Sequence, residues 1–249
     1  MIHMTVGELE RYLAEYLNVA EFQDFTFNGL NIGVRNWEIR GVITATDYDK
    51  NLVDRAEENG ANVIIVHHGL WWGKPYPIVD KTYDELAYLM HKKIALLGYH
   101  LPLDAHPEIG NNAYILKTLG ISPEAYNPLD VGFAVDVDMS VDDITSRLET
   151  TLGRPREVWV FGNGNVRRLG VISGSGGSFV NTLVSDGVDT FITGEITYPA
   201  WREFKKYGIN VILYGHYRSE TGGPKLLAEH IGAKFDIPAQ FVDIYERAM

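Results

Sequence analysis

Hydrophobic positions along this chain come in short runs that alternate with amphipathic stretches. The run at residues 40–46 is followed by a helical periodicity at residues 49–59, and then by a wholly apolar run at residues 63–66. A wholly apolar run is typical of a strand that is buried on both faces. Strands that alternate with helices predict βαβ units with largely parallel pairing. We therefore expect an α/β fold.

The same alternation continues to the end of the chain. The pattern predicts further strands at residues 94–99, 131–138, 169–173, 190–193, 210–214 and 240–245. It predicts further helices at residues 1–17, 83–91, 111–119, 140–152, 178–185, 199–207 and 224–231. Ser140 followed by Asp143 is typical of a capping box at a helix start. The segment at residues 121–130 contains two prolines and reads as a linker.

A block of the first half of the chain returns in the second half. Residues 39–69 match residues 168–195, and the match continues where residues 94–104 lie over residues 209–220. In this alignment His100 falls on His216, Asp104 falls on Glu220, and His68 falls on Glu195. A duplicated unit predicts two similar lobes, which we place at residues 1–126 and 127–249. We expect interlinked three-layer α/β lobes with mostly parallel sheets and a shared dinuclear metal site between them.

Composition narrows the functional classes. The chain of 249 residues has no cysteine, which excludes disulfides, thiolate metal sites and cysteine nucleophiles. Its formal net charge of −11 disfavours a surface broadly adapted to nucleic acid. There is no basic segment of the kind that begins a signal peptide and no apolar run long enough to span a membrane. We therefore expect a cytoplasmic protein.

Two adjacent histidines, His67 and His68, follow the buried strand at residues 63–66. Ligands of doubly wound sheets bind beyond the carboxyl ends of the strands, and neighbouring side chains there point to opposite sides of the chain. The two imidazoles therefore suit two metal ions better than one. A structural role at the edge of the core is the alternative.

The other candidate ligands follow the third strand of each repeat. His100 and Asp104 form an H-x3-D pattern, and His216 and Glu220 form the equivalent H-x3-E pattern. Each pattern alone is weak, and its weight comes from the match between the repeats. We interpret Asp104, His216 and Glu220 as metal ligands.

Several neighbouring features leave their role open. His100, His106 and Glu195 are candidates to position groups or to move protons, with a plain structural role as the alternative. The turn at residues 174–177 lacks the complete motif of a phosphate loop. Trp71 and Trp72 line the site, pack at a subunit interface or stack on a planar substrate, and the first two interpretations are favoured.

Four segments together make the chain resemble the Nif-three-like family of dinuclear-metal proteins, whose members are described as GTP cyclohydrolase I type 2 homologues. They are VIIVHHGLWW (63–72), GYHLPLDAHPEIGNN (98–112), FITGE (191–195) and GHYRSETGG (215–223). The chain resembles the short form, which lacks the domain that some relatives carry between the lobes. The resemblance implies a toroidal homohexamer and metal ligation by His67, His68, Asp104, His216 and Glu220.

Two functions follow as hypotheses. The first is a hydrolase that uses two divalent ions, for which zinc, iron, manganese, cobalt or nickel would suit the nitrogen and oxygen donors, and that acts on a nucleotide-like or related small molecule. The second is a non-catalytic ring or scaffold that binds nucleic acid, with Arg154, Arg156, Arg167 and Arg168 at its pore. No separate organic cofactor is expected.

Overall fold

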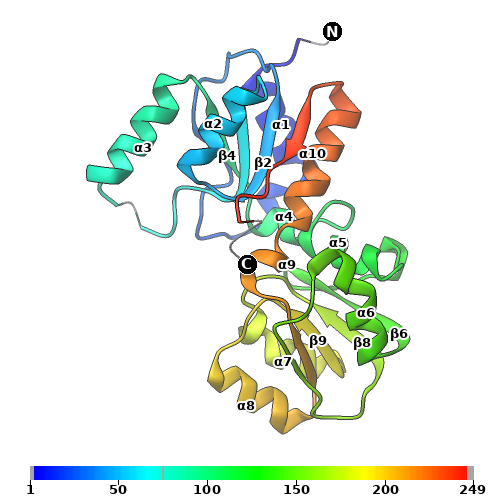
Figure 1. Cartoon of the computed structure of the whole chain (residues 1–249). Helices are drawn as coiled ribbons and strands as arrows, with labels where there is room; N and C mark the ends of the chain where they lie inside the picture. Colours follow the sequence, from blue (N-terminus) through cyan, green and yellow to red (C-terminus); the bar gives the residue numbers. More distant parts are fainter. Residues whose placement is uncertain (1–2, 75, 246–249) are drawn as a thin grey trace. The chain divides into compact units, whose positions relative to one another are not determined.

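The computed structural model describes residues 3–74 and 76–245, coloured by sequence in Figure 1. The chain divides into two compact units, one made of the segments Met1–Leu103 and Pro224–Met249 and one made of Asp104–Gly223. The chain passes from one unit to the other within α4 (Leu101–Ala105) and again within α10 (Gly222–Phe235). These units differ from the division at residues 126 and 127, because that division follows the sequence repeat alone.

The first unit is built on one five-stranded sheet. Its strand order is β1-β4-β3-β2-β11. The bounds are Gly29–Ile32 for β1, Val42–Asp47 for β2, Val63–His68 for β3, Ala95–Gly98 for β4 and Ala239–Phe241 for β11. All neighbours are parallel except β1, which runs antiparallel to β4. The predicted parallel pairing is confirmed here.

Helices cover both faces of this sheet. Helices α2 (Lys50–Glu58) and α3 (Asp80–His91) pack on one face with a shared core that includes Ile43, Leu52 and Leu89. Helix α1 (Val6–Tyr16) begins at a capping box formed by Thr5 and Glu8. Its residues Tyr12 and Tyr16 stack on His230 of α10. Figure 1 shows where both helices lie in the first unit. A short 3-10 turn, η1 (Val19–Glu21), follows α1.

The second unit contains a six-stranded sheet of mixed direction. Its order is β5-β6-β8-β9-β10-β7, where β8, β9 and β10 are parallel and the other pairings are antiparallel. The bounds are Asn127–Leu129 for β5, Gly132–Ser140 for β6, Glu157–Trp159 for β7, Asn165–Val171 for β8, Thr190–Thr193 for β9 and Asn210–Leu213 for β10. The parallel centre agrees with the predicted βαβ units, and antiparallel strands extend it on both sides.

The two faces of this sheet pack against different helices. Along β9, Ile192 belongs to the core shared with α5 (Asn111–Thr118) and α6 (Val141–Leu152), whereas Phe191 belongs to the core shared with α7 (Val180–Ser185) and α8 (Tyr198–Tyr207). Successive residues of a strand face opposite sides. The alternation therefore gives the helix–sheet–helix layering that the sequence predicts. The 3-10 turns η2 (Pro123–Ala125) and η3 (Gly176–Phe179) and the short helix α9 (His216–Ser219) complete the unit.

The repeat extends further than the sequence match. In each unit a capped helix is followed by an edge strand, three parallel strands with helices between them, and a short helix after the last strand. The edge strands β1 and β7 are equivalent, since each pairs antiparallel with the third parallel strand. The capping box of Ser140 and Asp143 on α6 matches that of Thr5 and Glu8 on α1.

Most predicted elements occur with small shifts at their ends. The predicted strand at residues 190–193 coincides with β9, but β3 runs on through His68, two residues beyond its predicted end. The predicted strand at residues 240–245 is shorter, and Asp243 lies outside β11. The helix predicted at residues 1–17 is observed as α1, and residues 1–2 lie outside the described part. Within that part, every helix is too short or too polar to cross a membrane.

Candidate metal centre

The histidines of the first unit lie at the carboxyl ends of adjacent parallel strands. His67 and His68 are the last residues of β3, and His100 follows β4. Because parallel strands bring their carboxyl ends to one edge of the sheet, the three imidazoles meet there. One ring nitrogen of each lies within 4.8 Å of those of the other two, which is close enough to share a metal ion. The His67 side chain is completely buried.

Each of these imidazoles is held through its Nδ1 atom. The Nδ1 of His67 lies 3.0 Å from the carbonyl oxygen of Tyr99, and that of His68 lies 2.6 Å from a carboxylate oxygen of Asp47. A carbonyl oxygen only accepts hydrogen bonds, so Nδ1 of His67 donates to it and Nε2 is the ring nitrogen on the other side of the imidazole. Histidines that bind metals are oriented in this way.

The third imidazole, His100, is anchored by a buried carboxylate. Its Nδ1 lies 3.0 Å from Asp24, whose side chain is only 2% exposed. Burial raises the pKa of Asp24, but hydrogen bonds from His100, from the Asn28 amide and from the Leu101 N–H outweigh it and lower the pKa to about 2. Asp24 is therefore ionised at neutral pH and fixes the orientation of the His100 ring.

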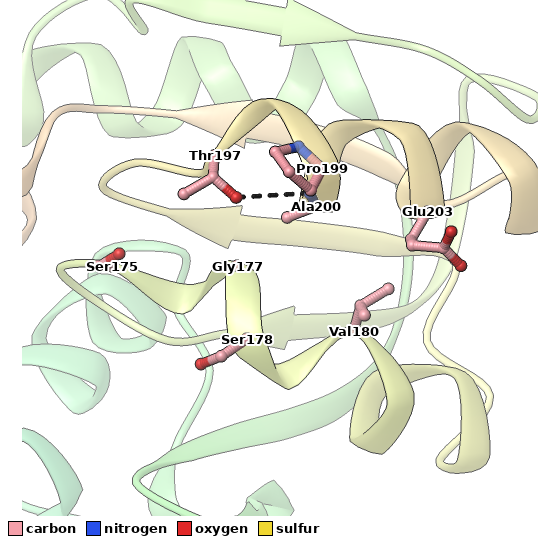
Figure 2. A pocket seen from close by; sticks show the side chains of 8 residues that line it. All are labelled: Ser175, Gly177, Ser178, Val180, Thr197, Pro199, Ala200 and Glu203. Atoms are coloured by element: carbon pink, nitrogen blue, oxygen red, sulfur yellow. Dashed lines mark hydrogen bonds between the residues drawn. The ribbon is translucent and has the colours of Figure 1, made fainter.

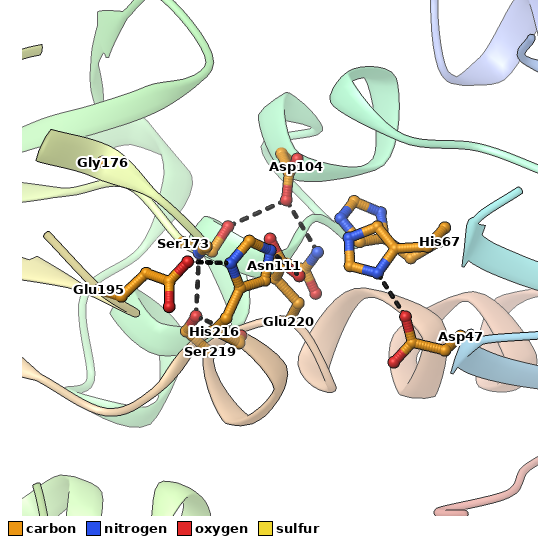
Figure 3. A network of polar contacts seen from close by, with 12 residues as sticks. Asp47, His67, Asp104, Asn111, Ser173, Gly176, Glu195, His216, Ser219 and Glu220 are labelled. Carbon is orange, nitrogen blue, oxygen red and sulfur yellow. Dashed lines mark hydrogen bonds and ion pairs between the residues drawn. The ribbon is translucent and has the colours of Figure 1, made fainter. Parts of the chain in front are cut away.

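In the second unit, the carboxylate of Asp104 is buried and hydrogen-bonded. The Nδ2 of Asn111 donates to its Oδ1 over 2.8 Å, and the hydroxyl of Ser173 donates to the same oxygen over 2.9 Å. Figure 3 shows both side chains converging on Asp104. One carboxylate oxygen of Asp104 lies within 4.8 Å of one of Glu220. Two carboxylates held this close are a typical cation-binding arrangement.

His216 and Glu220 form a directly contacting pair. His216 begins α9, and its Nε2 lies 3.3 Å from Oε2 of Glu220, which is buried. Its Nδ1 lies 2.9 Å from Oε1 of Glu195, so this imidazole is also anchored by a carboxylate (Figure 3). Gly174 passes close to the pair, because a Cβ built there would lie 2.1 Å from Oε1 of Glu220. The backbone can approach Glu220 this closely only at glycine.

The predicted site residues are thus distributed over both units. His67, His68 and His100 lie in the first, and Asp104, His216, Glu220, His106 and Glu195 lie in the second. Glu195 contacts His216 and orients it. The Nδ1 of His106 accepts hydrogen bonds from the N–H groups of Glu108 and Ile109, both over 3.2 Å, and so stabilises the turn before α5.

The sequence interpretation missed the residues that orient the proposed ligands and His100: Asp24, Asp47, Asn111 and Ser173. Of these, Asp47 could have been found from strand register, because it lies opposite His68 in the parallel pairing of β2 with β3. Asp24 lies in a loop that is 76 residues away from His100 along the chain, and no local pattern indicates their contact.

The tryptophan pair divides between two environments. Trp71 packs on its own loop, with its ring centroid 5.7 Å from that of Tyr76. Trp72 instead contacts the histidines, with its ring centroid 5.4 Å from His68 and 5.0 Å from His100. The interpretation in which a tryptophan lines the site therefore fits Trp72, and Trp71 is a packing residue of the loop.

The glycine-rich turn at residues 174–177 forms hydrogen bonds with the end of β9 and the residues that follow it. The N–H of Gly176 donates to the hydroxyl of Thr193, and the carbonyl of Gly174 accepts from the N–H of Glu195. The hollow beside it, drawn in Figure 2, is lined by Ser175, Ser178 and Thr197 and also by the carboxylate-bearing Glu203. An acidic side chain at this hollow disfavours an anion, so the interpretation of the segment as a turn is preferred.

The arginines named for a nucleic-acid pore are largely engaged with acidic residues. Arg154 pairs with Glu149 over 2.8 Å, Arg167 pairs with Asp138 over 2.6 Å, and Arg168 pairs with both Asp136 and Asp186. Carboxylates that lie this close to the guanidinium groups weaken the local positive potential.

Fold and side chains together define a duplicated α/β protein with histidine and carboxylate clusters at the strand ends. Comparison with known proteins then identifies the family. Residues 4–247 match the family described as Duf34/NIF3 (NGG1p interacting factor 3), and the chain belongs to that family.

Relatives match over nearly their whole length. The chain is 34% identical over 242 residues to a protein of Deinococcus radiodurans named GTP cyclohydrolase 1 type 2 homolog, covering 95% of this chain and 92% of the relative. A protein of the same name from Archaeoglobus fulgidus is 34% identical over 247 residues and matches with 97% and 98% coverage. The crystal structure of TTHA1606 from Thermus thermophilus superposes with a TM-score of 0.87 at 36% identity, covering 96% of this chain and 98% of that one.

Proposed function

We propose that the chain is a hydrolase that uses two divalent metal ions, bound by His67, His68, Asp104, His216 and Glu220. The observation that carries the proposal is the orientation of the imidazole rings. His67, His68 and His216 are each held at Nδ1 by a carbonyl or carboxylate oxygen, which directs Nε2 to serve as the ligand atom. A histidine that only fills space or caps a turn needs no such orientation.

The donor atoms fit divalent first-row metals. The five residues offer imidazole nitrogens and carboxylate oxygens, a combination that suits zinc, iron, manganese, cobalt or nickel. The hydrogen bonds from Asn111 and Ser173 to Oδ1 fix the orientation of the Asp104 carboxylate, which is the group that would bind a cation. The chemistry that bound divalent ions supply is Lewis-acid activation of an electrophilic carbon or phosphorus and of the water that attacks it.

The remaining residues orient groups and move protons. Asp47 and Glu195 hold the rings of His68 and His216, so that their Nε2 atoms keep a fixed direction. His100 is our candidate for proton transfer, because Asp24 holds its Nδ1 while its ring lies with His67 and His68. Glu195 and His106 have the positioning and structural contacts described above, so we give them no proton-transfer role.

The substrate class follows from relatives. The curated relatives are named GTP cyclohydrolase 1 type 2 homolog, and we propose a nucleotide-like or related small molecule as the substrate. We also propose the homohexameric ring that the family resemblance implies. Large apolar side chains are exposed on the second unit, where Val160 is 50% exposed and Tyr198 is 72% exposed. This exposure supports contact of these side chains with further copies of the chain.

The test measures metal content and turnover together. Purified protein is stripped, reloaded with single metals, analysed by elemental mass spectrometry and assayed on GTP, other nucleotides and phosphodiesters. We expect about two ions per chain and metal-dependent hydrolysis. The His68→Ala and Glu220→Ala variants should lose metal and turnover. The controls His91→Ala and Glu229→Ala, which replace exposed side chains on α3 and α10, should keep both.

Three results would each contradict a part of the proposal. Full metal content and turnover in either ligand variant would refute the ligand assignment. Two bound metals without turnover on any substrate would refute the hydrolase and favour a structural role for the metals. Light scattering of the same preparation measures the assembly, and a monomer would refute the ring.

A further inference from the structure

Two exposed aromatic side chains adjoin the histidine group of the first unit. Phe25 is 62% exposed and Trp72 is 37% exposed, although both are large apolar residues. Their ring centroids lie 5.6 Å apart with the planes inclined at 45°. We name this pair, Phe25 and Trp72, the aromatic platform.

The backbone fixes the platform in place. An isolated antiparallel bridge joins Thr26 to Trp72, and the N–H of Gly73 donates to the carbonyl of Phe25 over 2.6 Å. Two loops that lie far apart in sequence are thereby paired where they carry the two rings. The pairing of the two loop backbones therefore holds Phe25 and Trp72 next to each other.

The platform also contacts the imidazoles directly. Trp72 and His100 form an edge-to-face contact with a centroid distance of 5.0 Å and an interplanar angle of 72°. Phe25 forms the same kind of contact with His100 at 5.5 Å and 64°. Trp72 lies 5.4 Å from His68 as well. Aromatic surface that is left open to solvent is therefore continuous with the side chains that we place in the metal centre.

The exposed aromatic faces next to the histidines favour a ligand that contains a planar ring. A planar ring stacked on Phe25 or Trp72 gains dispersion and quadrupole interactions that a saturated ring of the same size does not. A ligand held in this way would have its ring on the platform and its adjoining bonds next to His68 and His100. An aliphatic or purely ionic ligand would leave the aromatic faces unused.

From these contacts we infer that the aromatic platform binds the planar heteroaromatic ring of a free small-molecule substrate and sets specificity for flat rings. The inference rests on the proposed function for the reaction that follows binding. It names the chemical class of the substrate and assigns Phe25 and Trp72 as specificity-determining residues.

The test compares ligands that differ only in planarity. Equilibrium dialysis measures binding of uridine and of 5,6-dihydrouridine, which has the same polar groups on a puckered ring, together with guanosine and adenosine. We expect the flat nucleosides to bind and dihydrouridine to bind at least about tenfold more weakly. Equal affinity for uridine and dihydrouridine, or no binding of any flat nucleoside, would overturn the inference.

Variants localise the effect. Trp72→Ala should weaken binding of the flat ligands by between about fivefold and a hundredfold, and Trp72→Phe should recover most of it. The matched control is Trp201→Ala, which removes a tryptophan from an aromatic cluster on α8 of the other unit and should leave affinity unchanged. If Trp72→Ala fails to fold by circular dichroism, Phe25→Leu removes the other flat face with little change in volume. Affinity within twofold of wild type in the folded platform variants would refute the assignment.

Dialysis is repeated with metal-free and metal-loaded protein, because this separates the two proposals. Preference for flat rings in a protein that takes up no metal on reloading would leave the platform standing and refute the metal hydrolase. Normal metal content without that preference would refute the platform alone. Binding of a single-stranded oligonucleotide without binding of the free nucleosides would also refute it, since the proposed occupant is a small molecule.

Discussion

The imidazole of His68 and the carboxylate of Asp47 are joined by a 2.6 Å contact between Nδ1 and Oδ1. The two residues lie opposite each other on neighbouring parallel strands. The register of β2 against β3 therefore sets the direction of a proposed metal ligand. In the second unit, Glu195 does the same for His216 from the residues that follow β9.

Replacing this carboxylate should weaken metal binding without unfolding the protein. We expect Asp47→Asn to lower metal affinity by about tenfold to a hundredfold, since an amide orients the imidazole less strongly and makes it less basic. Competition with a chelator of known affinity measures the change. Asp54→Asn is the control, because Asp54 accepts a hydrogen bond from Tyr88 on the helical face of the same unit. Unchanged affinity in Asp47→Asn would remove the orienting role.

Asp24 should make the free energy of unfolding depend on pH in the acid range. Its folded-state pKa of about 2 lies below the ordinary 3.8, so its contribution is complete above the ordinary value and is lost as the pH falls through about 2. The difference corresponds to about 2 kcal/mol. In urea unfolding of metal-free protein, Asp24→Asn should be destabilised by about this amount at pH 6 and should approach wild type near pH 2.

The exposed Asp84 provides the comparison for this experiment. The Asp84→Asn variant changes the same functional group on the surface of α3, and its unfolding should follow wild type across the whole range. If Asp24→Asn shows the same pH dependence as wild type, the carboxylate of Asp24 is not the group that titrates.

A methyl group at position 174 should disturb the second unit at Glu220. Gly174 has φ of +62°, and a Cβ there would lie 2.1 Å from Oε1 of Glu220. Gly187 has φ of +74° but nothing within 4 Å of the equivalent Cβ. Gly187→Ala should therefore cost only the backbone strain, about 1–2 kcal/mol, and keep its metal. Gly174→Ala should be destabilised further and lose metal. Equal metal content in the two variants would contradict the predicted clash.

His106 should prove structural. Its Nδ1 accepts two backbone N–H groups, and His106→Ala should lower the free energy of unfolding by about 1–3 kcal/mol because those donors lose their partner. Turnover per folded molecule should stay within twofold of wild type. His106→Asn, whose side-chain oxygen can accept the same donors, should recover part of the stability. A tenfold loss of turnover in a folded variant would restore a role in proton transfer.

Periodicity and the repeat were sufficient to predict much of this fold. The run at residues 190–193, in which Phe191 and Ile192 lie between two threonines, is buried on both faces, and its predicted bounds coincide with β9. The edge strands β1 and β7 were missed, because each is short, only partly buried and paired on one side alone. The end of β3 was misjudged because His67 and His68 are polar and yet continue the strand to the site.

The same limits apply to the site. The repeat indicated Asp104, His216 and Glu220, since duplication places equivalent residues at equivalent strand ends. His67 and His68 were indicated by their position directly after a buried strand. Apart from Asp47, which strand register could have indicated, the orienting residues that the sequence interpretation missed could not be predicted, because their contacts depend on tertiary structure. Asp24 and His100 are one example, and Asp104 with Ser173, which are 69 residues apart, is another.

The division of the chain bears on the order in which the protein can form as the ribosome makes it. Every element of the unit Asp104–Gly223 is contiguous, but the other unit needs both ends of the chain. Until Ala239–Phe241 emerges, β2 lacks its neighbour β11 and presents a bare strand edge. The unit that is begun first is therefore completed last. Until β11 has been synthesised, the edge of β2 stays unpaired and open to pairing with other strands.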